Sequence, residues 1–312
     1  MNKDFGVHPI VMLDISEIRK FGNIELLARQ LVEGFITGLH KSPYHGFSVE
    51  FAEHRLYNTG ESTRHLDWKV LARTDKLFVK RYEEETNLRA AILLDVSSSM
   101  YYPQPTHNKI AFGIMAAATL GYMLQKQRDA VGLFTFAEEL MSQTAVKSSQ
   151  SHLRQLFIQL QGLLDSTPPK QQRTTATPVI HQMAARLHRR SLVILLSDLL
   201  ETESDISSLL AALQHLKHRQ HEVLLFHIQD QSTEQDFAFS ERPHRFIDLE
   251  TGQSLKLRPA EIRAEYQQKV KERMEEIKLR CGNYKIDLIE VDAQKDIRQV
   301  LMPYLIKRTR MR

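Results

Sequence analysis

After Asn87 the chain alternates short apolar runs with longer segments in which apolar residues recur every three or four positions. The short runs are typical of buried parallel strands, and the longer segments are typical of helices that cover a sheet. We therefore predict a doubly wound α/β domain with a mostly parallel sheet. The predicted strands are Ala90–Leu94, Ala130–Thr135, Glu139–Thr144, Leu192–Leu196, Glu222–Ile228 and Lys285–Val291, and the predicted helices are Lys109–Gln127, Ser151–Leu163, Pro178–His188, Ser204–His218 and Ile297–Tyr304.

An extra element interrupts this alternation between the fifth and sixth predicted strands. Residues 245–257 form two short segments on either side of Gly252, which predicts a β-hairpin. Pro259–Arg280 carries apolar residues at helical spacing among many charges, which predicts a long helix. We expect the hairpin and the helix to form an insertion at about residues 240–282.

The first 88 residues lack the alternation of strands and helices that follows them. Apolar residues recur at helical spacing from Ile15 to Leu39, which predicts an amphipathic helix that docks on the main domain. Residues 40–88 are charge-dense, with short β segments expected at Phe47–Phe51 and Leu77–Tyr82. We therefore divide the chain into a helix and segment at 1–88 that pack on the main domain, the main domain at 89–306 and a basic tail at 307–312.

Composition narrows the class of protein. Hydrophobic residues make up 42% and charged residues 26%, as in folded soluble proteins. The sequence contains no apolar run of about 20 residues and no signal-peptide pattern, and its single cysteine, Cys281, excludes an intramolecular disulfide. These features predict a cytoplasmic protein without a membrane span. The 42 basic residues nearly balance 38 acidic ones, so we do not expect nucleic acid binding.

Polar residues that could bind a ligand lie at or near the ends of the predicted strands. Asp95, Ser97 and Ser99 follow the first strand, Thr177 comes just before a predicted helix, and Asp198 follows the fourth strand. The carboxyl ends of parallel strands share one edge of a sheet, where ligands of such folds bind. Oxygen ligands without His or Cys favour a hard cation, Mg²⁺ or Mn²⁺, over zinc. Taken singly, each of these residues is also typical of a helix cap or a polar loop.

This constellation resembles the metal-ion-dependent adhesion site of von Willebrand factor A domains. The resemblance implies that Ser97 and Ser99 bind the ion directly, that Thr177 binds it directly or through water, and that Asp95 and Asp198 act mainly through water. Two carboxylates roughly cancel the charge of a divalent ion, and neutral hydroxyls leave it able to accept an acidic side chain from a protein partner.

The segment from Ser42 to Glu85 is similar to the signature of the bacterial family called domain of unknown function 58, apart from Gly60-Glu61, where that family usually has Gly-Asp. The resemblance implies that the segment is coupled to a von Willebrand A-like domain and that the protein assists a MoxR-type AAA+ ATPase in the assembly or maturation of other proteins. The signature residues are Arg55, Tyr57, Arg64, Asp67, Trp68, Arg73, Lys80, Glu83 and Glu85. The charged residues among them form either a structural ion-pair network or a partner surface.

Two other classes of function compete with metal-dependent recognition. A Mg²⁺-dependent phosphoester hydrolase would use Glu201 or His181 as a base, but the chain has no P-loop, no nucleophile elbow and no acidic residue at position 97. A basic nucleic-acid-binding protein would bind with steep salt dependence, but aromatic and basic residues are not interleaved. We therefore expect no catalytic residues.

Overall fold

The computed structural model describes residues 18, 22–40, 54–56, 78–80, 88–166, 176–200 and 203–310. The chain divides into two compact units, one formed by Met1–Phe35 with Leu88–Arg312 and the other by Ile36–Asn87. The first predicted helix therefore begins in the larger unit, whereas most of the charge-dense segment forms the smaller one.

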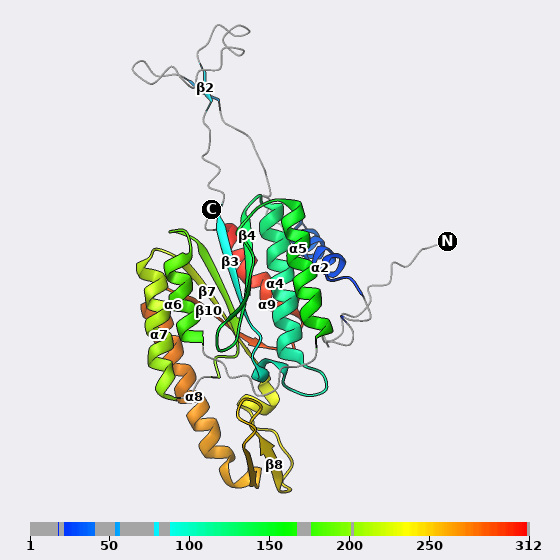
Figure 1. Ribbon diagram of the computed structural model, residues 1–312, viewed down its shortest axis with the longest axis vertical. Coiled ribbons are helices and arrows are strands. Elements are labelled where there is room, and N and C mark those ends of the chain that lie inside the picture. The colour runs from blue at the N-terminus through cyan, green and yellow to red at the C-terminus, as the bar shows by residue number, and fades with distance from the viewer. Residues whose placement is uncertain are drawn as a thin grey trace, which may run out of the picture. The chain divides into compact units, whose positions relative to one another are not determined.

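In the larger unit, helices and strands alternate along the chain (Figure 1). Its helical elements are α2 (Ile24–His40, which runs on into the smaller unit), η2 (Ser98–Tyr101), α4 (Asn108–Lys126), α5 (Gln150–Asp165), α6 (Ala176–Arg186), α7 (Glu203–His218), the π-helical turn η3 (Gln231–Gln235), α8 (Pro259–Asn283) and α9 (Ile297–Arg310). Its strands are β3 (Arg89–Asp95), β4 (Ala130–Phe136), β5 (Leu140–Gln143), β6 (Leu192–Ser197), β7 (Glu222–Gln229), β8 (His244–Ile247), β9 (Ser254–Leu257) and β10 (Asp287–Asp292).

Six strands form the central sheet in the order β10-β7-β6-β3-β4-β5. Five run parallel, and β5 at one edge is antiparallel to β4. The chain builds outward from β3 through β4 to β5 and then returns to the other side of β3 with β6. This mixed α/β architecture with a mostly parallel sheet confirms the predicted class of fold and is consistent with a Rossmann-like protein. Its switch of direction falls between β3 and β6.

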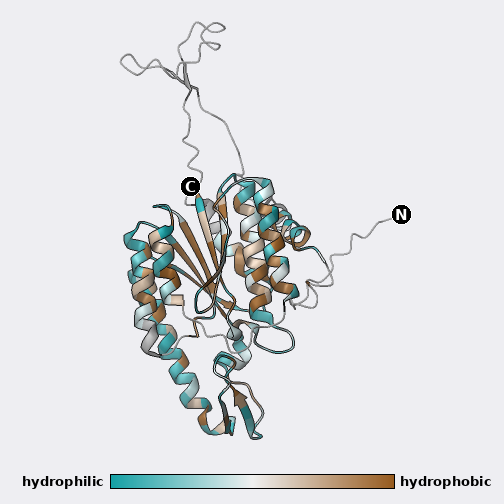
Figure 2. Cartoon of the chain, in the orientation of Figure 1, coloured by the Kyte–Doolittle hydropathy of each residue, from teal (hydrophilic) through white to brown (hydrophobic). Residues whose placement is uncertain are grey.

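Helices cover both faces of the sheet and create two apolar layers (Figure 2). Because alternate side chains of a strand point to opposite faces, neighbouring residues of β3 enter different cores. Ile92 and Leu94 pack with α2, α4, α5 and α9, whereas Ala91 and Leu93 pack with α6, α7 and α8. The continuous apolar runs of the sequence thus correspond to strands that are buried on both sides.

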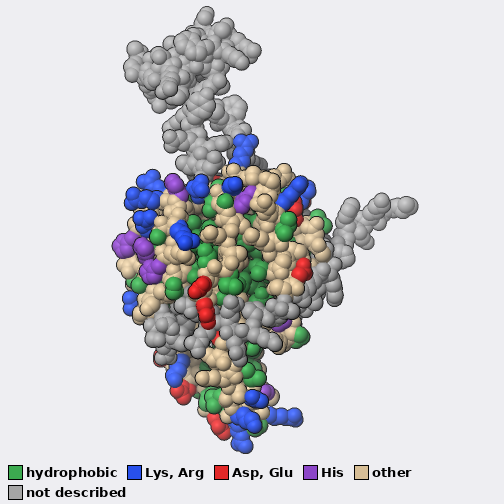
Figure 3. Space-filling view, in the orientation of Figure 1, with side chains coloured by type: hydrophobic (Ala, Val, Ile, Leu, Met, Phe, Trp, Pro, Cys, Tyr) green, Lys and Arg blue, Asp and Glu red, His purple; other side chains and the backbone are tan. Residues whose placement is uncertain are grey.

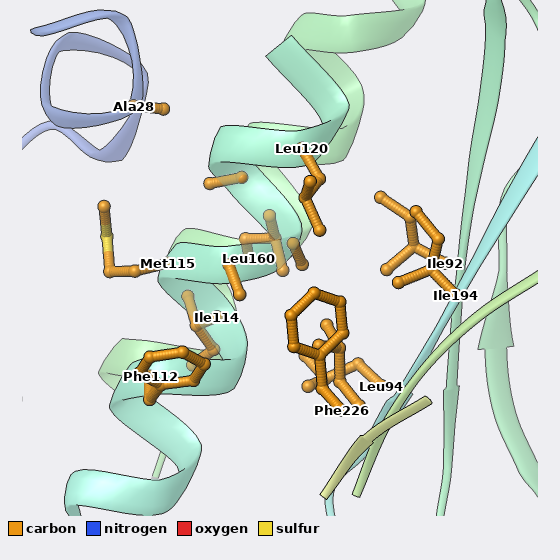
Figure 4. Close-up of a cluster of buried hydrophobic side chains, with 14 of the residues drawn as sticks. Ala28, Ile92, Leu94, Phe112, Ile114, Met115, Leu120, Leu160, Ile194 and Phe226 are labelled. Atoms are coloured by element: carbon orange, nitrogen blue, oxygen red, sulfur yellow. The ribbon is translucent and has the colours of Figure 1, made fainter. Parts of the chain in front are cut away.

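Helix α4 lies at the centre of the first layer (Figure 4). Leu120 points toward the sheet, where Ile92 and Phe226 lie, while Met115 is on the side that faces α2. Contacts on several sides explain why almost every residue of α4 is buried and why its sequence is nearly uniformly apolar.

The predicted insertion extends beyond the carboxyl ends of the strands (Figure 1). It contains the hairpin β8–β9 and α8, and together with η3, which precedes the predicted bounds, these elements form what we call the arm. Phe237 joins its parts, because its ring stacks on Phe246 of β8 with centroids 5.6 Å apart and lies 4.5 Å from the ring of Tyr266 on α8. Gly252 takes a positive φ of 73° at the hairpin turn, as the sequence pattern predicted.

Three predicted boundaries were wrong for local reasons. The helix predicted from Ile15 is not continuous, because Gly22 has a φ of 65° and Asn23 Oδ1 caps α2 by accepting the Leu26 N–H. Strand β10 starts at Asp287, since Lys285 has a φ of 54°. Helix α6 begins two residues earlier than predicted, so Thr177 lies inside its first turn.

The smaller unit contains an antiparallel pair, β1 (His54–Leu56) and β2 (Phe78–Lys80). The predicted segment Leu77–Tyr82 contains β2, whereas Phe47–Phe51 lies outside the described residues. Of the signature residues, Arg55 lies in β1 and Lys80 ends β2. The others lie outside the described residues, so their network or partner role stays a prediction: Tyr57, Arg64, Asp67, Trp68, Arg73, Glu83 and Glu85.

Candidate metal site

The first part of the site is the turn after β3. This strand is buried between β4 and β6, and its apolar run ends at Asp95, whose side chain is fully buried. The Ser97 N–H donates a 2.9 Å hydrogen bond to Asp95 Oδ1, which folds the chain back over the carboxylate. The hydroxyl oxygens of Ser97 and Ser99 lie 3.0 Å apart, and both serines are buried.

Strand β6 supplies the second part of the site. Its last residue, Ser197, donates a 2.6 Å hydrogen bond to Asp95 Oδ2 and accepts the Leu199 N–H at 3.0 Å. The next residue, Asp198, is buried and accepts the Leu200 N–H at Oδ1. Two neighbouring parallel strands thus bring two carboxylates to one edge of the sheet, as their positions after apolar runs predicted.

A buried lysine completes the cluster. Lys109 Nζ donates hydrogen bonds to Asp198 Oδ2 at 2.8 Å and to Glu234 Oε1 at 2.6 Å, and its side chain is fully buried. The Tyr102 ring centroid lies 5.6 Å from the ammonium. A lysine is almost never fully buried without partners, and here two carboxylates and an aromatic ring surround its charge.

Electrostatics within the cluster are strongly perturbed. Burial, together with the charge of Asp198, raises the pKa of Asp95 to about 7. Burial by itself would lower the pKa of Lys109, but attraction to Asp198 and Glu234 outweighs it and raises that pKa. Burial also raises the pKa of Glu234 against the opposing pull of Lys109. Ionisation of Asp95 would thus place a second, uncompensated negative charge beside Asp198. A further cation bound at the cluster would favour this ionised form.

His227 on β7 contacts the backbone of Asp198. Its Nε2 donates a 3.0 Å hydrogen bond to the Asp198 carbonyl oxygen. Burial lowers the pKa of this imidazole to about 4, so the ring is neutral at physiological pH. The turn after β6 is thereby held in place without an added positive charge.

The geometry of the hydroxyls fits Mg²⁺ or Mn²⁺. An octahedral Mg²⁺ holds oxygen ligands at about 2.1 Å, so adjacent ligands are separated by about 3.0 Å. The hydroxyls of Ser97 and Ser99 are hydrogen-bonded to each other with their oxygens 3.0 Å apart, and this separation is also compatible with that edge. Within the described part of the chain, no three His, Cys, Asp or Glu side chains are grouped to hold a metal. Any ion here would therefore depend on the serine hydroxyls as well as the carboxylates.

The fifth predicted ligand, Thr177, is half-buried in the first turn of α6. Its place in the site stays a prediction.

Of the two bases that the alternative hydrolase would use, His181 lies in the described part of the chain. His181 Nδ1 lies 3.1 Å from His215 Nδ1 on the exposed side of α6 and α7, and Glu201 lies outside the described residues.

Two hollows on the surface lie next to α6. One of about 630 Å³ runs between β5 and α6, and another of about 410 Å³ is lined by residues such as Phe134 and Met183. Figure 3 shows apolar side chains gathered over the sheet between α6 and α5. Neither hollow is lined by the four clustered predicted ligands, so neither provides them with a substrate pocket.

Sequence reasoning missed three members of the cluster: Ser197, Lys109 and Glu234. For Lys109 a signal was present, since it is one of two lysines in an otherwise apolar helix. No local pattern distinguishes Ser197, and Glu234 is one of many charged residues.

The fold and this cluster define a Rossmann-like α/β protein with a polar site at the switch point of its sheet. A family model with the description "Protein of unknown function DUF58" matches residues 53–276, and the chain belongs to this family.

Curated relatives of this chain include two mycobacterial proteins. "Uncharacterized protein Rv1480" of Mycobacterium tuberculosis and "Uncharacterized protein Mb1516" of Mycobacterium bovis are each 24% identical over 199 residues. The match covers 62% of this chain and 62% of each relative, so the chain spans less than two thirds of their length. The solved structure of the conserved hypothetical protein BatB from Bacteroides thetaiotaomicron aligns with a TM-score of 0.43 and 14% identity, over 72% of this chain and 99% of that one.

Among the described residues, no helix combines the length and apolarity that crossing a bilayer requires.

Proposed function

We propose that this chain is a divalent-metal-dependent protein-recognition module with a site of the von Willebrand factor A type. The observation that carries the proposal is that the hydrogen-bonded hydroxyls of Ser97 and Ser99 and the buried carboxylates of Asp95 and Asp198 lie at one edge of the sheet. Ser97 and Ser99 would hold Mg²⁺ or Mn²⁺, and the two carboxylates would balance its charge.

The ligand set determines what such a site recognises. A divalent ion held by two neutral hydroxyls supplies a positive centre that an outside carboxylate can approach. Asp95 is already oriented by Ser97 and Ser197, so it does not need to reorganise when a partner arrives. We therefore propose a partner protein that presents an Asp or Glu side chain. A MoxR-type AAA+ ATPase is the partner that the family resemblance suggests.

Recognition accounts for the cluster better than hydrolysis does. A hydrolase needs a base beside the ion, and the imidazole of His181 instead pairs with His215. The buried imidazole of His227 faces a backbone carbonyl, and its low pKa makes it a weak base.

Metal binding can be tested directly by calorimetric titration of the full chain with Mg²⁺ and with Mn²⁺. We expect saturable binding by the wild type that is lost or weakened at least tenfold in Asp95→Asn and Ser97→Ala. Ser191→Ala is the matched control, since Ser191 is a buried serine at the opposite end of β6. Absence of binding by the wild type, or equal affinity in all variants, would contradict the proposal.

Partner recognition needs a second measurement. An acidic peptide or a purified AAA+ partner should bind the metal-loaded chain and dissociate on addition of a chelator. Binding that survives both the chelator and Ser97→Ala would show that recognition does not use the ion.

A further inference from the structure

Lys109 connects two regions that are far apart in sequence. Its ammonium contacts Asp198 in the candidate metal site and Glu234 in η3, the first element of the arm. The contact with Asp198 spans 89 positions and that with Glu234 spans 125. One buried cation therefore serves both the metal site and the arm.

Lys109 and Glu234 carry opposite charges, so together they leave the charge of −2 from Asp95 and Asp198 unchanged, and the whole cluster matches a divalent ion. Asp95, Asp198 and Glu234 contribute three negative charges when ionised, and Lys109 contributes one positive charge, so the net charge is −2. Without Glu234 the remaining three groups would carry −1. Because buried charges are weakly screened, such a difference changes the affinity for a cation strongly.

We infer that Lys109 is the internal counter-ion of the metal site, shared between Asp198 and Glu234, and that its pairing shifts toward Glu234 when the metal is bound. This inference rests on the proposed function. In the absence of metal the ammonium neutralises Asp198. When the metal ion binds beside Asp198, the Lys109 ammonium pairs mainly with Glu234. The lysine can therefore stay buried.

The contacts of η3 show which elements a change in the pairing of Lys109 would affect. Glu234 Oε2 accepts the Asp230 N–H at 2.8 Å, and the Glu234 carbonyl accepts the Tyr266 hydroxyl of α8 at 3.0 Å. Gln267 on α8 also donates to the Asp236 carbonyl at 2.8 Å. A change at Glu234 therefore reaches both η3 and α8.

The arm also contacts the turn after β6 directly. Arg273 of α8 donates a hydrogen bond to the carbonyl of Leu199, the residue after Asp198. The arm is therefore linked to Asp198 by two routes, through Lys109 and through this backbone contact. Metal binding should therefore reduce the mobility of the arm. A partner protein would then bind to a more rigid arm.

The affinity for Mn²⁺, measured by calorimetry on the full chain, tests the charge argument. Lys109→Met should raise affinity about tenfold or more, since the site becomes more negative, and Glu234→Gln should lower it by a similar factor. The double variant restores the net charge of −2 and should bind within about threefold of the wild type. Lys126→Met is the matched control, because Lys126 is an exposed lysine of the same helix.

Each result has a definite meaning. If the wild type binds Mn²⁺ and the Lys109 and Glu234 variants bind equally well, the inference is overturned and the proposed function stands. If neither the wild type nor Lys109→Met binds, both are overturned. Binding by Lys109→Met alone supports the counter-ion role but removes the proposed function of the wild type. Should Lys109→Met fail to fold, Glu234→Gln still decides, because unchanged affinity in that variant contradicts the inference.

Hydrogen exchange provides a readout that a purely structural ion pair would not change. Saturating Mg²⁺ should slow exchange of the backbone amides at 230–236 in the wild type. Glu234→Gln, at an Mg²⁺ concentration that saturates it, should lose this effect while amides near Ser97 remain protected. Equal protection of 230–236 in both proteins would overturn the coupling to the arm.

Discussion

Ser197 donates a 2.6 Å hydrogen bond to Asp95 across the boundary between β6 and β3. The two residues are 102 positions apart in the sequence, and the pairing of neighbouring parallel strands brings them together. Because both side chains are fully buried, the sheet itself orients the Asp95 carboxylate. The candidate site is therefore preorganised by the same strand pairing that forms the core.

Replacing this hydroxyl should affect both stability and metal binding. Ser197→Ala removes the donor to Asp95 and the acceptor of the Leu199 N–H, which should lower the free energy of unfolding by about 1–3 kcal/mol. Urea denaturation measures this loss, and calorimetry should show weaker Mg²⁺ binding than in the wild type. Ser191→Ala also loses a side-chain hydrogen bond, which Ser191 donates to the His188 carbonyl, but should keep the Mg²⁺ affinity. Equal weakening in both variants would indicate a general loss of stability.

Two glycines in helices should respond to alanine with opposite signs. At Gly113 a new Cβ would lie 2.8 Å from Leu94 Cδ1 and 3.5 Å from Met100 Cε, so Gly113→Ala should cost about 1–3 kcal/mol by overpacking the core. At Gly162 of α5 nothing lies within 4 Å, and Gly162→Ala should stabilise the protein by roughly 0.5–1 kcal/mol. Thermal or urea unfolding of the pair measures both effects. Stabilisation by Gly113→Ala would mean that the α4–sheet contact is looser than described.

Stability should fall on acidification partly because of His221. This buried ring accepts the Ser191 N–H at Nδ1, and burial lowers its pKa below the usual value of about 6.5. The unfolded chain therefore binds the proton more readily, so stability is complete above about pH 6.5 and decreases as the pH falls below it. Urea unfolding at a series of pH values should give a shallower acid decline for His221→Gln than for the wild type. An identical slope would exclude a contribution from this residue.

Cys281 should be unreactive in the native protein. Its thiol lies in the last turn of α8 and is buried, and burial raises its pKa to about 11, so almost no thiolate is present at pH 8. A thiol reagent at pH 8 should react slowly with the folded chain and rapidly in 6 M guanidinium chloride. The reaction rate as a function of urea concentration should then follow unfolding. Fast labelling without denaturant would show that α8 detaches readily from the sheet.

Local sequence patterns predicted much of the fold because the burial of an element determines which of its positions are apolar. Apolar runs such as 90–94 and 192–196 are typical of strands buried on both faces, and the structure contains both strands. The position of Asp95 after such a run placed it at the carboxyl edge, where the structure also puts it. Helix starts were less predictable, since the cap at Asn23 and the early start of α6 depend on single residues.

The sequence by itself determined the class of fold, the edge of the sheet where polar side chains meet, and the oxygen-rich chemistry of Asp95, Ser97 and Ser99. Only the tertiary structure decided that Ser197 orients Asp95 and that Lys109 lies between Asp198 and Glu234. The reason is physical. Periodicity reports which side of an element is buried, whereas the partner of a buried charge is set by strand order and helix packing over about a hundred residues of chain.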